Sequence, residues 1–279
     1  MKQNEIIENS NKKITKKGIV KFDPDTAKTL PISTNRKRTK GWVVEREYNG
    51  LILAIEAFES LNAYDLIALF QMLDDYSKNF ELWQEIGEIH DDDFVRKLMQ
   101  REFSLNILCK QRDIKTDKRN RETIAKSFER WYKTELIYKR TDHITKTRYL
   151  FEYKVDKDFK TITIVANTNF LDFCLTNGMA MNWARLVKYG KNYYALELDI
   201  YLQFRSIQYG KKTKKYSYPN TINEKTLFKH LGIETEVKDD REKRRKVKQA
   251  FKKFEEITGI KYFYDRKERK WFKNSYINN

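Results

Sequence analysis

The stretch that decides the fold runs from Asn192 to Lys273. It contains four patterned segments: NYYALELDIYLQFRSIQ (192–208), INEKTLFKHLG (222–232), DDREKRRKVKQAFKKFEEITGI (239–260) and KYFYDRKERKWFK (261–273). The first three segments have the apolar spacing of helices, and the fourth alternates aromatic and charged residues around a turn. The stretch therefore predicts two helices, a basic third helix and a β-hairpin, in that order.

The third predicted helix has one apolar face and one basic face. At 100° per residue the apolar stripe consists of Val247, Ala250, Phe251, Phe254 and Ile257. The opposite face carries Arg241, Arg245, Lys248, Lys252 and, beside them, Gln249. Asp239 and Asp240 suit the start of a helix and Gly259 suits its end. Four cations along about 16 Å of helix fit a DNA major groove, and a solvated charged surface is the alternative interpretation.

An earlier part of the chain shows the same succession. DKRNRETIAKSFERWYK (117–133) predicts a second, weaker basic helix, and β-like segments follow it over residues 135–167. A helix-turn-helix with an appended β-hairpin is the outline of a winged helix. We therefore predict an α+β fold with two tandem winged-helix domains. Residues 1–41 would be a disordered basic arm, 42–176 the first domain for dimerisation and DNA contact, and 177–279 the second domain for the main DNA recognition.

Four further segments complete the predicted secondary structure of the first half. WVVERE (42–47) is typical of a short strand. GLILAIEAFESL (50–61) and NAYDLIALFQMLDDYSK (62–78) are interpreted as core helices, the latter with Asn62 as its N-cap. FVRKLMQREFSLNILCKQRD (94–113) predicts a further helix or helix pair.

The charge of the chain is large and unevenly spread. The net charge is +17, with +7 on residues 1–40, −9 on 41–106, +8 on 107–190 and +11 on 191–279. Such a surplus favours a polyanionic partner, with nucleic acid first and an anionic membrane surface second. The sequence has no apolar run of 18 residues, and its first residues do not resemble a secretory signal. With Cys109 and Cys174 interpreted as buried free thiols, we expect a cytoplasmic protein that does not enter a membrane.

Catalytic and metal-binding patterns are not found in the sequence. The three histidines, His90, His143 and His230, are far apart, and no phosphate-binding loop of the GxxxxGK[ST] type occurs. The run His90 to Asp93 suits a helix start better than a metal site, because adjacent acids on a helix point in different directions. We therefore expect no enzymatic activity, no metal and no cofactor.

Three passages resemble plasmid replication initiators of the RepA/Rep type, which have two winged helices. They are TITIVANTNFLDFCL (161–175), YALELDIYLQFRS (194–206) and the helix pair INEKTLFKHLG with REKRRKVKQAFKKFEEI. The resemblance implies sequence-specific binding of double-stranded DNA at repeated origin sites (iterons), melting of an adjacent AT-rich stretch and recruitment of the host replicative helicase or initiator. It also implies a bacterial host and a homodimer formed through the first domain, although the acidic and basic N-terminal part does not match the family. By position, the main recognition helix is Arg241–Ile257 and the lesser one is Arg119–Lys133.

The candidate DNA-binding residues fall in four groups. On the last basic helix they are Arg241, Arg244, Arg245, Lys248, Gln249 and Lys252, and on the final hairpin Arg266, Lys267 and Arg269. On the earlier basic helix they are Arg119, Arg121, Lys126, Arg130 and Lys133, and in a basic loop at 210–220 they are Lys211, Lys212, Lys214 and Lys215. The alternatives are a winged-helix transcription repressor, a metal-dependent DNA nicking enzyme, and an RNA-binding or structural protein.

Overall fold

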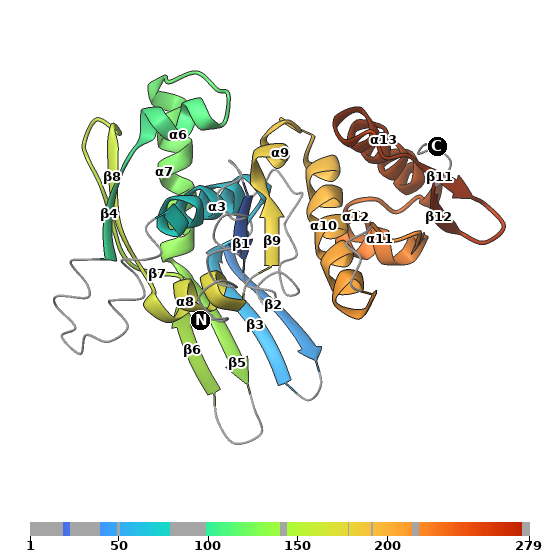
Figure 1. The fold of residues 1–279 in the computed structure, drawn as a ribbon, viewed down its shortest axis with the longest axis horizontal. Helices are drawn as coiled ribbons and strands as arrows, with labels where there is room; N and C mark the ends of the chain where they lie inside the picture. The colour runs from blue at the N-terminus through green and yellow to red at the C-terminus, as the bar shows by residue number, and fades with distance from the viewer. Residues whose placement is uncertain are drawn as a thin grey trace, which may run out of the picture.

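The computed structural model describes residues 19–22, 40–48, 51–78, 99–139, 144–177, 179–190, 192–213 and 218–274. Within these ranges the protein is an α+β fold whose paired strands all run antiparallel. Figure 1 shows the first half of the chain on the left and the second half, in orange and red, on the right. None of the described helices is both long enough and apolar enough to cross a membrane.

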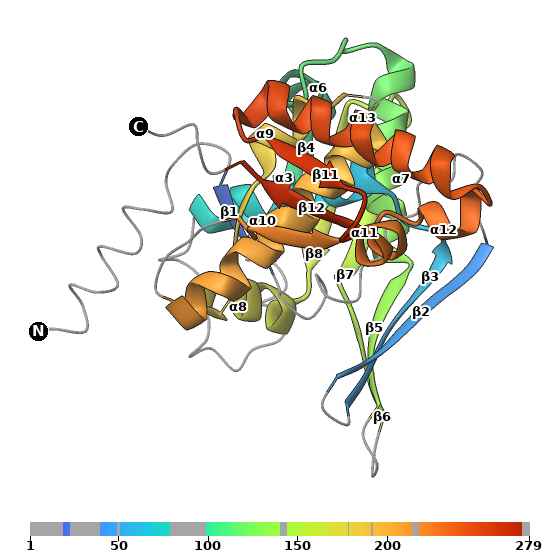
Figure 2. The same cartoon turned by 90° about the vertical axis from the view of Figure 1, so that its right-hand side faces the viewer.

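The second half follows the predicted order of helices and hairpin. Its elements are α10 (Tyr193–Thr213), β10 (Thr221–Asn223), α11 (Glu224–His230), α12 (Ile233–Glu236), α13 (Asp240–Thr258), β11 (Tyr262–Asp265) and β12 (Lys270–Lys273). The three strands form a sheet in the order β10-β12-β11, and α13 packs against α10. Figure 2 shows α13 lying across this small sheet.

The first half repeats this arrangement. Its corresponding elements are α3 (Ala63–Lys78), β4 (Gln100–Ser104), α6 (Leu105–Gln111), α7 (Lys118–Tyr132), β7 (Leu150–Val155) and β8 (Thr161–Ala166). Their strands form a sheet in the order β4-β8-β7, so in both halves the last strand lies between the first strand and its hairpin partner. The two halves therefore share one strand arrangement.

A four-stranded sheet distinguishes the first half from the second. Its strands are β2 (Lys40–Tyr48), β3 (Leu51–Glu59), β5 (Thr134–Lys139) and β6 (Ile144–Arg148), in the order β2-β3-β5-β6. The hairpin β5–β6 lies in the sequence between α7 and β7, at a point where the second half continues directly from α13 into β11. In Figure 1 the four strands project from the body of the molecule.

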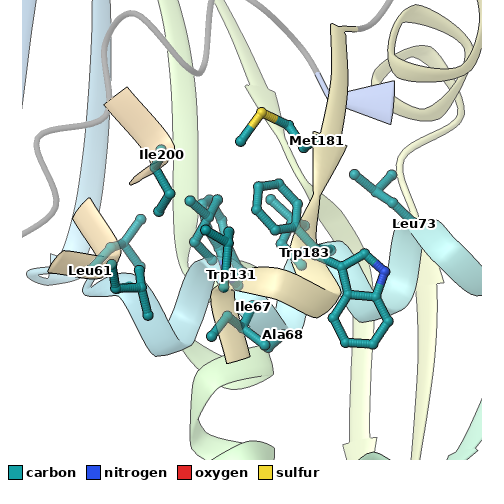
Figure 3. Close-up of a cluster of buried hydrophobic side chains, with 14 of the residues drawn as sticks. Leu61, Ile67, Ala68, Leu73, Trp131, Met181, Trp183 and Ile200 are labelled. Atoms are coloured by element: carbon teal, nitrogen blue, oxygen red, sulfur yellow. The ribbon is translucent and has the colours of Figure 1, made fainter. Parts of the chain in front are cut away.

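One continuous core joins the two halves. Between them lie α8 (Thr168–Asn177), β9 (Met179–Asn182) and α9 (Trp183–Val187), and β9 pairs with β1 (Ile19–Phe22). Figure 3 shows Trp131 of α7 and Ile200 of α10 in the same buried cluster as Trp183. The predicted free thiols Cys109 and Cys174 are confirmed, and both are buried.

Three secondary-structure predictions are wrong. Within the helix predicted over residues 50–61, Leu51–Glu59 forms strand β3 instead, because its backbone pairs with β2 on one side and β5 on the other. Gln100–Ser104 is strand β4, since it pairs with β8. Ile19–Phe22 is a strand paired with β9, so the predicted disordered arm of residues 1–41 contains regular structure. Pairing between distant segments overrides local propensity in each case.

Candidate nucleic-acid interface

Helix α13 is held so that its basic face points outward. The side chain of Asp239 accepts hydrogen bonds from the amides of Arg241 (3.1 Å) and Glu242 (3.2 Å), and Gly259 ends the helix with a φ of 72°. The predicted apolar stripe is confirmed: Val247, Ala250, Phe251 and Phe254 are buried, and Ile257 packs partly buried against the core. The basic face is exposed at Arg241, Arg245, Lys248, Gln249 and Lys252.

The apolar stripe of α13 rests on the final hairpin. The ring of Phe251 lies 4.5 Å from that of Trp271 and 4.8 Å from that of Tyr262, measured between centroids. Aromatic contacts of this kind stabilise the pair beyond the area that they bury. The orientation of the basic face is therefore set by the packing of the opposite face.

An open groove of about 1460 Å³ runs between α13 and β11. Its helix wall carries Arg241, Arg245, Lys248, Gln249 and Lys252, and its strand wall carries Lys261, Phe263 and Arg266. The groove is therefore lined on both sides by cations. Asp239, Glu242 and Glu255 also line the groove, but they are outnumbered by the cations. A concave surface with a surplus of positive charge attracts a polyanion and raises its rate of association.

Exposed cations of the groove pair with neighbouring acids: Nζ of Lys261 lies 3.7 Å from Oε1 of Glu255, and Arg245 forms a shorter pair. Its Nε lies 2.6 Å from Oε2 of Glu242, one turn earlier, and its side chain is 60% exposed. The bond from Arg245 lowers the pKa of Glu242. Exposed ion pairs contribute little to stability, so a phosphate can replace the carboxylate at small cost.

Arg244 and Arg269 have an internal partner that the sequence did not reveal. Both donate to the buried carboxylate of Glu224, Arg244 at 2.6 Å and Arg269 at 2.7 Å. Burial alone would raise the pKa of Glu224, but hydrogen bonds from Arg244, Tyr264 and Arg269 hold it below its usual value. The two arginines were predicted as DNA contacts, and in the structure each is anchored to the protein.

The predicted turn of the final hairpin is found between β11 and β12. Arg266 and Lys267 are exposed in the turn between β11 and β12. Asp265 fixes this turn, because its Oδ1 accepts from the amides of Lys267 (2.7 Å) and Glu268 (3.1 Å). Two cations are therefore presented beside the groove.

Helix α7, the counterpart of α13 in the first half, has a weaker cationic face. Arg119, Lys126 and Lys133 are exposed, and Lys133 pairs with Glu129 at 2.6 Å. The prediction that Arg130 shares this face is wrong. Its guanidinium turns inward to the buried carboxylate of Asp65, with Nη2 2.8 Å from Oδ1, and its side chain is 13% exposed.

The remaining predicted contacts divide between structural positions and undescribed residues. Arg121 of α7 is half-buried, and it donates to the carbonyl of Thr116 (2.6 Å), which lies in the turn between α6 and α7. Lys211 and Lys212 lie in the last turn of α10, so their placement in a loop is wrong. Lys214 and Lys215 lie outside the described residues, as do His90, His143 and the acidic run Asp91–Asp93.

The passage LELDIYL of the second half contains a buried ion-pair partner. Asp199 in this passage is fully buried and accepts from Nε (2.7 Å) and Nη2 (2.5 Å) of Arg185. The bonds fasten α9 to α10, and thereby the connecting segment to the second half. Among the described residues, no group of three or more His, Cys, Asp or Glu side chains is placed to hold a metal ion.

Comparison with known proteins gives a likeness of fold. No family model matches the sequence, and no curated protein matches it significantly. A crystal structure of domains 2 and 3 of RctB superimposes with a TM-score of 0.57 at 12% identity, covering 90% of this chain and 98% of that one. A second structure of the same RctB domains gives a TM-score of 0.52 at 12% identity, covering 90% and 97%. The chain thus has a fold similar to that of RctB domains 2 and 3 over nearly its whole length.

Proposed function

We propose that this protein is a replication initiator that binds double-stranded DNA at origin repeats. The observation that carries the proposal is the exposed cationic face of α13, which lines an open groove with a basic hairpin opposite. The resemblance of the sequence to plasmid replication initiators supports the same function. So does the likeness of fold to RctB, a replication initiator.

Each half is proposed to be a winged helix. In both, a first helix, an edge strand, two or three further helices and a hairpin follow one another, with the last strand in the centre of the sheet. In this arrangement α13 is the main recognition helix and the turn Arg266–Arg269 is its wing. Helix α7 is the lesser recognition helix, because Glu122 and Glu129 stand among its exposed cations and Arg130 faces inward.

Binding energy would come from cations and amide groups directed at one duplex. Arginine pairs bidentately with guanine and glutamine with adenine, each contact contributing about 1–3 kcal/mol of discrimination. Arg241, Arg245 and Gln249 are the side chains of α13 suited to bases, and lysines neutralise phosphates. Two recognition helices in successive major grooves would protect about 20 base pairs.

A role at a replication origin would require further partners, which the resemblance to plasmid replication initiators implies. The bound protein would help to open an adjacent AT-rich stretch and recruit the host replicative helicase or initiator, in the cytoplasm of a plasmid-bearing bacterium. A homodimer formed through the first half is a further proposed partner. The protein would act through binding alone, without enzymatic activity.

Selection of duplexes from a random pool tests the proposal. The expected result is one enriched sequence of about two helical turns, occurring as direct repeats near the protein's own gene. No enrichment, or stronger binding of single strands than of duplex, would contradict it. Melting of a supercoiled plasmid carrying those repeats separates an initiator from a repressor, which would bind without opening the DNA.

A further inference from the structure

Glu224 lies where four elements of the second half meet. It is the first residue of α11, and its side chain has 0% exposure. The carboxylate accepts from Nε of Arg244 (2.6 Å), from Nε (2.9 Å) and Nη2 (2.7 Å) of Arg269, and from the hydroxyl of Tyr264. These donors belong to α13, to the hairpin turn and to β11. One buried carboxylate thus connects the recognition helix with the hairpin.

Both arginines remain partly exposed while they hold this carboxylate. The side chain of Arg244 is 36% exposed and lines the groove, and that of Arg269 is 48% exposed. The bonds to Glu224 use Nε of Arg244 and Nε and Nη2 of Arg269. Because a guanidinium has five N–H donors, each arginine retains donors for a second acceptor.

The backbone of the turn is fixed at the same place. Arg269 adopts a φ of 52°, a region that residues other than glycine seldom occupy. Its carbonyl accepts from the amide of Glu224 at 3.0 Å, and its Nη2 lies 3.7 Å from Oδ2 of Asp240 at the start of α13. The side chain and the main chain of Glu224 therefore both hold Arg269.

We propose that Glu224 is a positioning residue for DNA recognition, holding Arg244 and Arg269 at a fixed separation so that their remaining donors meet phosphates of one duplex. The inference rests on the proposed function and deepens it. Donors that are oriented before binding lose less conformational freedom on binding. Phosphate contacts fix the register of a protein on the duplex, so Glu224 would sharpen base reading by α13 without contacting DNA.

A purely structural role predicts a different outcome from a positioning role. Loss of stability would lower the folded fraction and weaken binding to every duplex by the same factor. Glu224→Gln keeps the shape of the side chain but removes the charge that holds both arginines. We expect its preference for the selected duplex over a random one to fall about tenfold. Binding of the random duplex would be as strong as that of the wild type or stronger. The slope of log K against log salt would be steeper by about 1, because the loss of the Glu224 carboxylate leaves one more positive charge free to neutralise a phosphate.

The test uses the full-length protein, a duplex that the wild type has selected from a random pool, and a random duplex of equal length. Glu256→Gln is the matched control, since Glu256 is an exposed acid on α13 whose loss changes the net charge equally. A preference of Glu224→Gln that falls no further than that of Glu256→Gln would overturn the inference. A wild type without any preference would overturn the proposed function as well.

A second variant keeps the inference testable if Glu224→Gln does not fold. Arg269→Lys retains the charge on a half-exposed turn residue but loses the planar fork that meets Glu224 and phosphate together. We expect weaker binding of both duplexes, with the selected duplex losing severalfold more affinity than the random one, so that the preference falls. An unchanged preference in Arg269→Lys would contradict the positioning role.

Discussion

Asp65 is a buried carboxylate on α3, and its partner Arg130 lies on α7, 65 residues later. Nε and Nη2 of the arginine reach Oδ1 of Asp65 at 3.0 and 2.8 Å. Helical spacing alone places Arg130 with the exposed cations of α7. The spacing tells which face of the helix a side chain is on, but it does not reveal a partner on another helix. The same holds for Glu224, whose arginines lie 20 and 45 residues away. Residues that follow the period, such as Phe254 and Lys248, were predicted correctly as buried and exposed.

At the residue scale, Arg130→Ala should be strongly destabilising. Removing one partner of a buried ion pair leaves the other charge uncompensated, which costs about 3–5 kcal/mol in the free energy of unfolding. Lys126→Ala, an exposed cation on the same helix, should cost less than about 0.5 kcal/mol. Chemical denaturation of both variants measures the difference. Similar stabilities would mean that Arg130 does not hold α3 to α7 in solution.

Glu224 should also give stability a dependence on pH. Its pKa in the folded protein lies below the ordinary value of 4.5, so its stabilisation is complete above about pH 4.5 and is lost as the pH falls through the folded pKa. Glu224→Gln should therefore be less stable than the wild type by about 2 kcal/mol at neutral pH, with a smaller difference at about pH 3.5. Thermal unfolding of both proteins across this range is the measurement. A difference that stays constant with pH would show that the charge of Glu224 contributes nothing to the fold.

At the element scale, α13 shows how much the local sequence determines. Asp239 and Gly259 marked both ends of the helix, and its apolar stripe marked the buried face. Strand β3 shows the opposite case. Its sequence LILAIEAFE is rich in residues that favour helices, and it becomes a strand because β2 and β5 lie on either side. That pairing joins segments about 80 residues apart, which no local pattern reports.

The N-cap of α13 can be tested by itself. Asp239→Ala removes the acceptor of the amides of Arg241 and Glu242 and should lower stability by about 1 kcal/mol. Asp239→Asn keeps a side-chain oxygen and should remain near the wild type. Thermal unfolding distinguishes the two variants. Equal losses for alanine and asparagine would assign the effect to the charge of Asp239 rather than to its hydrogen bonds.

At the scale of the whole molecule, the chain repeats one strand arrangement and uses the two copies unequally. The first copy carries the additional sheet β2-β3-β5-β6 and a helix α7 of mixed charge, whereas residues 191–279 carry a net charge of +11. The repetition was predictable, because both halves show the succession of basic helix and β-segments. The additional sheet was not predictable, since its strands come from two separate parts of the sequence.

The cationic surface of the second half predicts that duplex binding by the whole protein depends on salt. If six to eight phosphates are neutralised, log K for duplex binding should fall with log salt at a slope near −5 to −7. Fluorescence anisotropy with a labelled duplex of about 20 base pairs measures this slope. A slope between about 0 and −2 would mean that the basic face of α13 and the hairpin do not lie on the phosphates.

The most direct test compares two variants that remove the same charge from different surfaces. Lys248 lies on the basic face of α13, and Lys154 lies on β7 with a side chain that is 75% exposed. Lys248→Ala should weaken duplex binding about fivefold near 0.1 M salt and reduce the magnitude of the salt slope by about 1, whereas Lys154→Ala should leave both within error. Equal effects of the two substitutions would show that net charge alone attracts DNA, and that α13 is not the recognition helix.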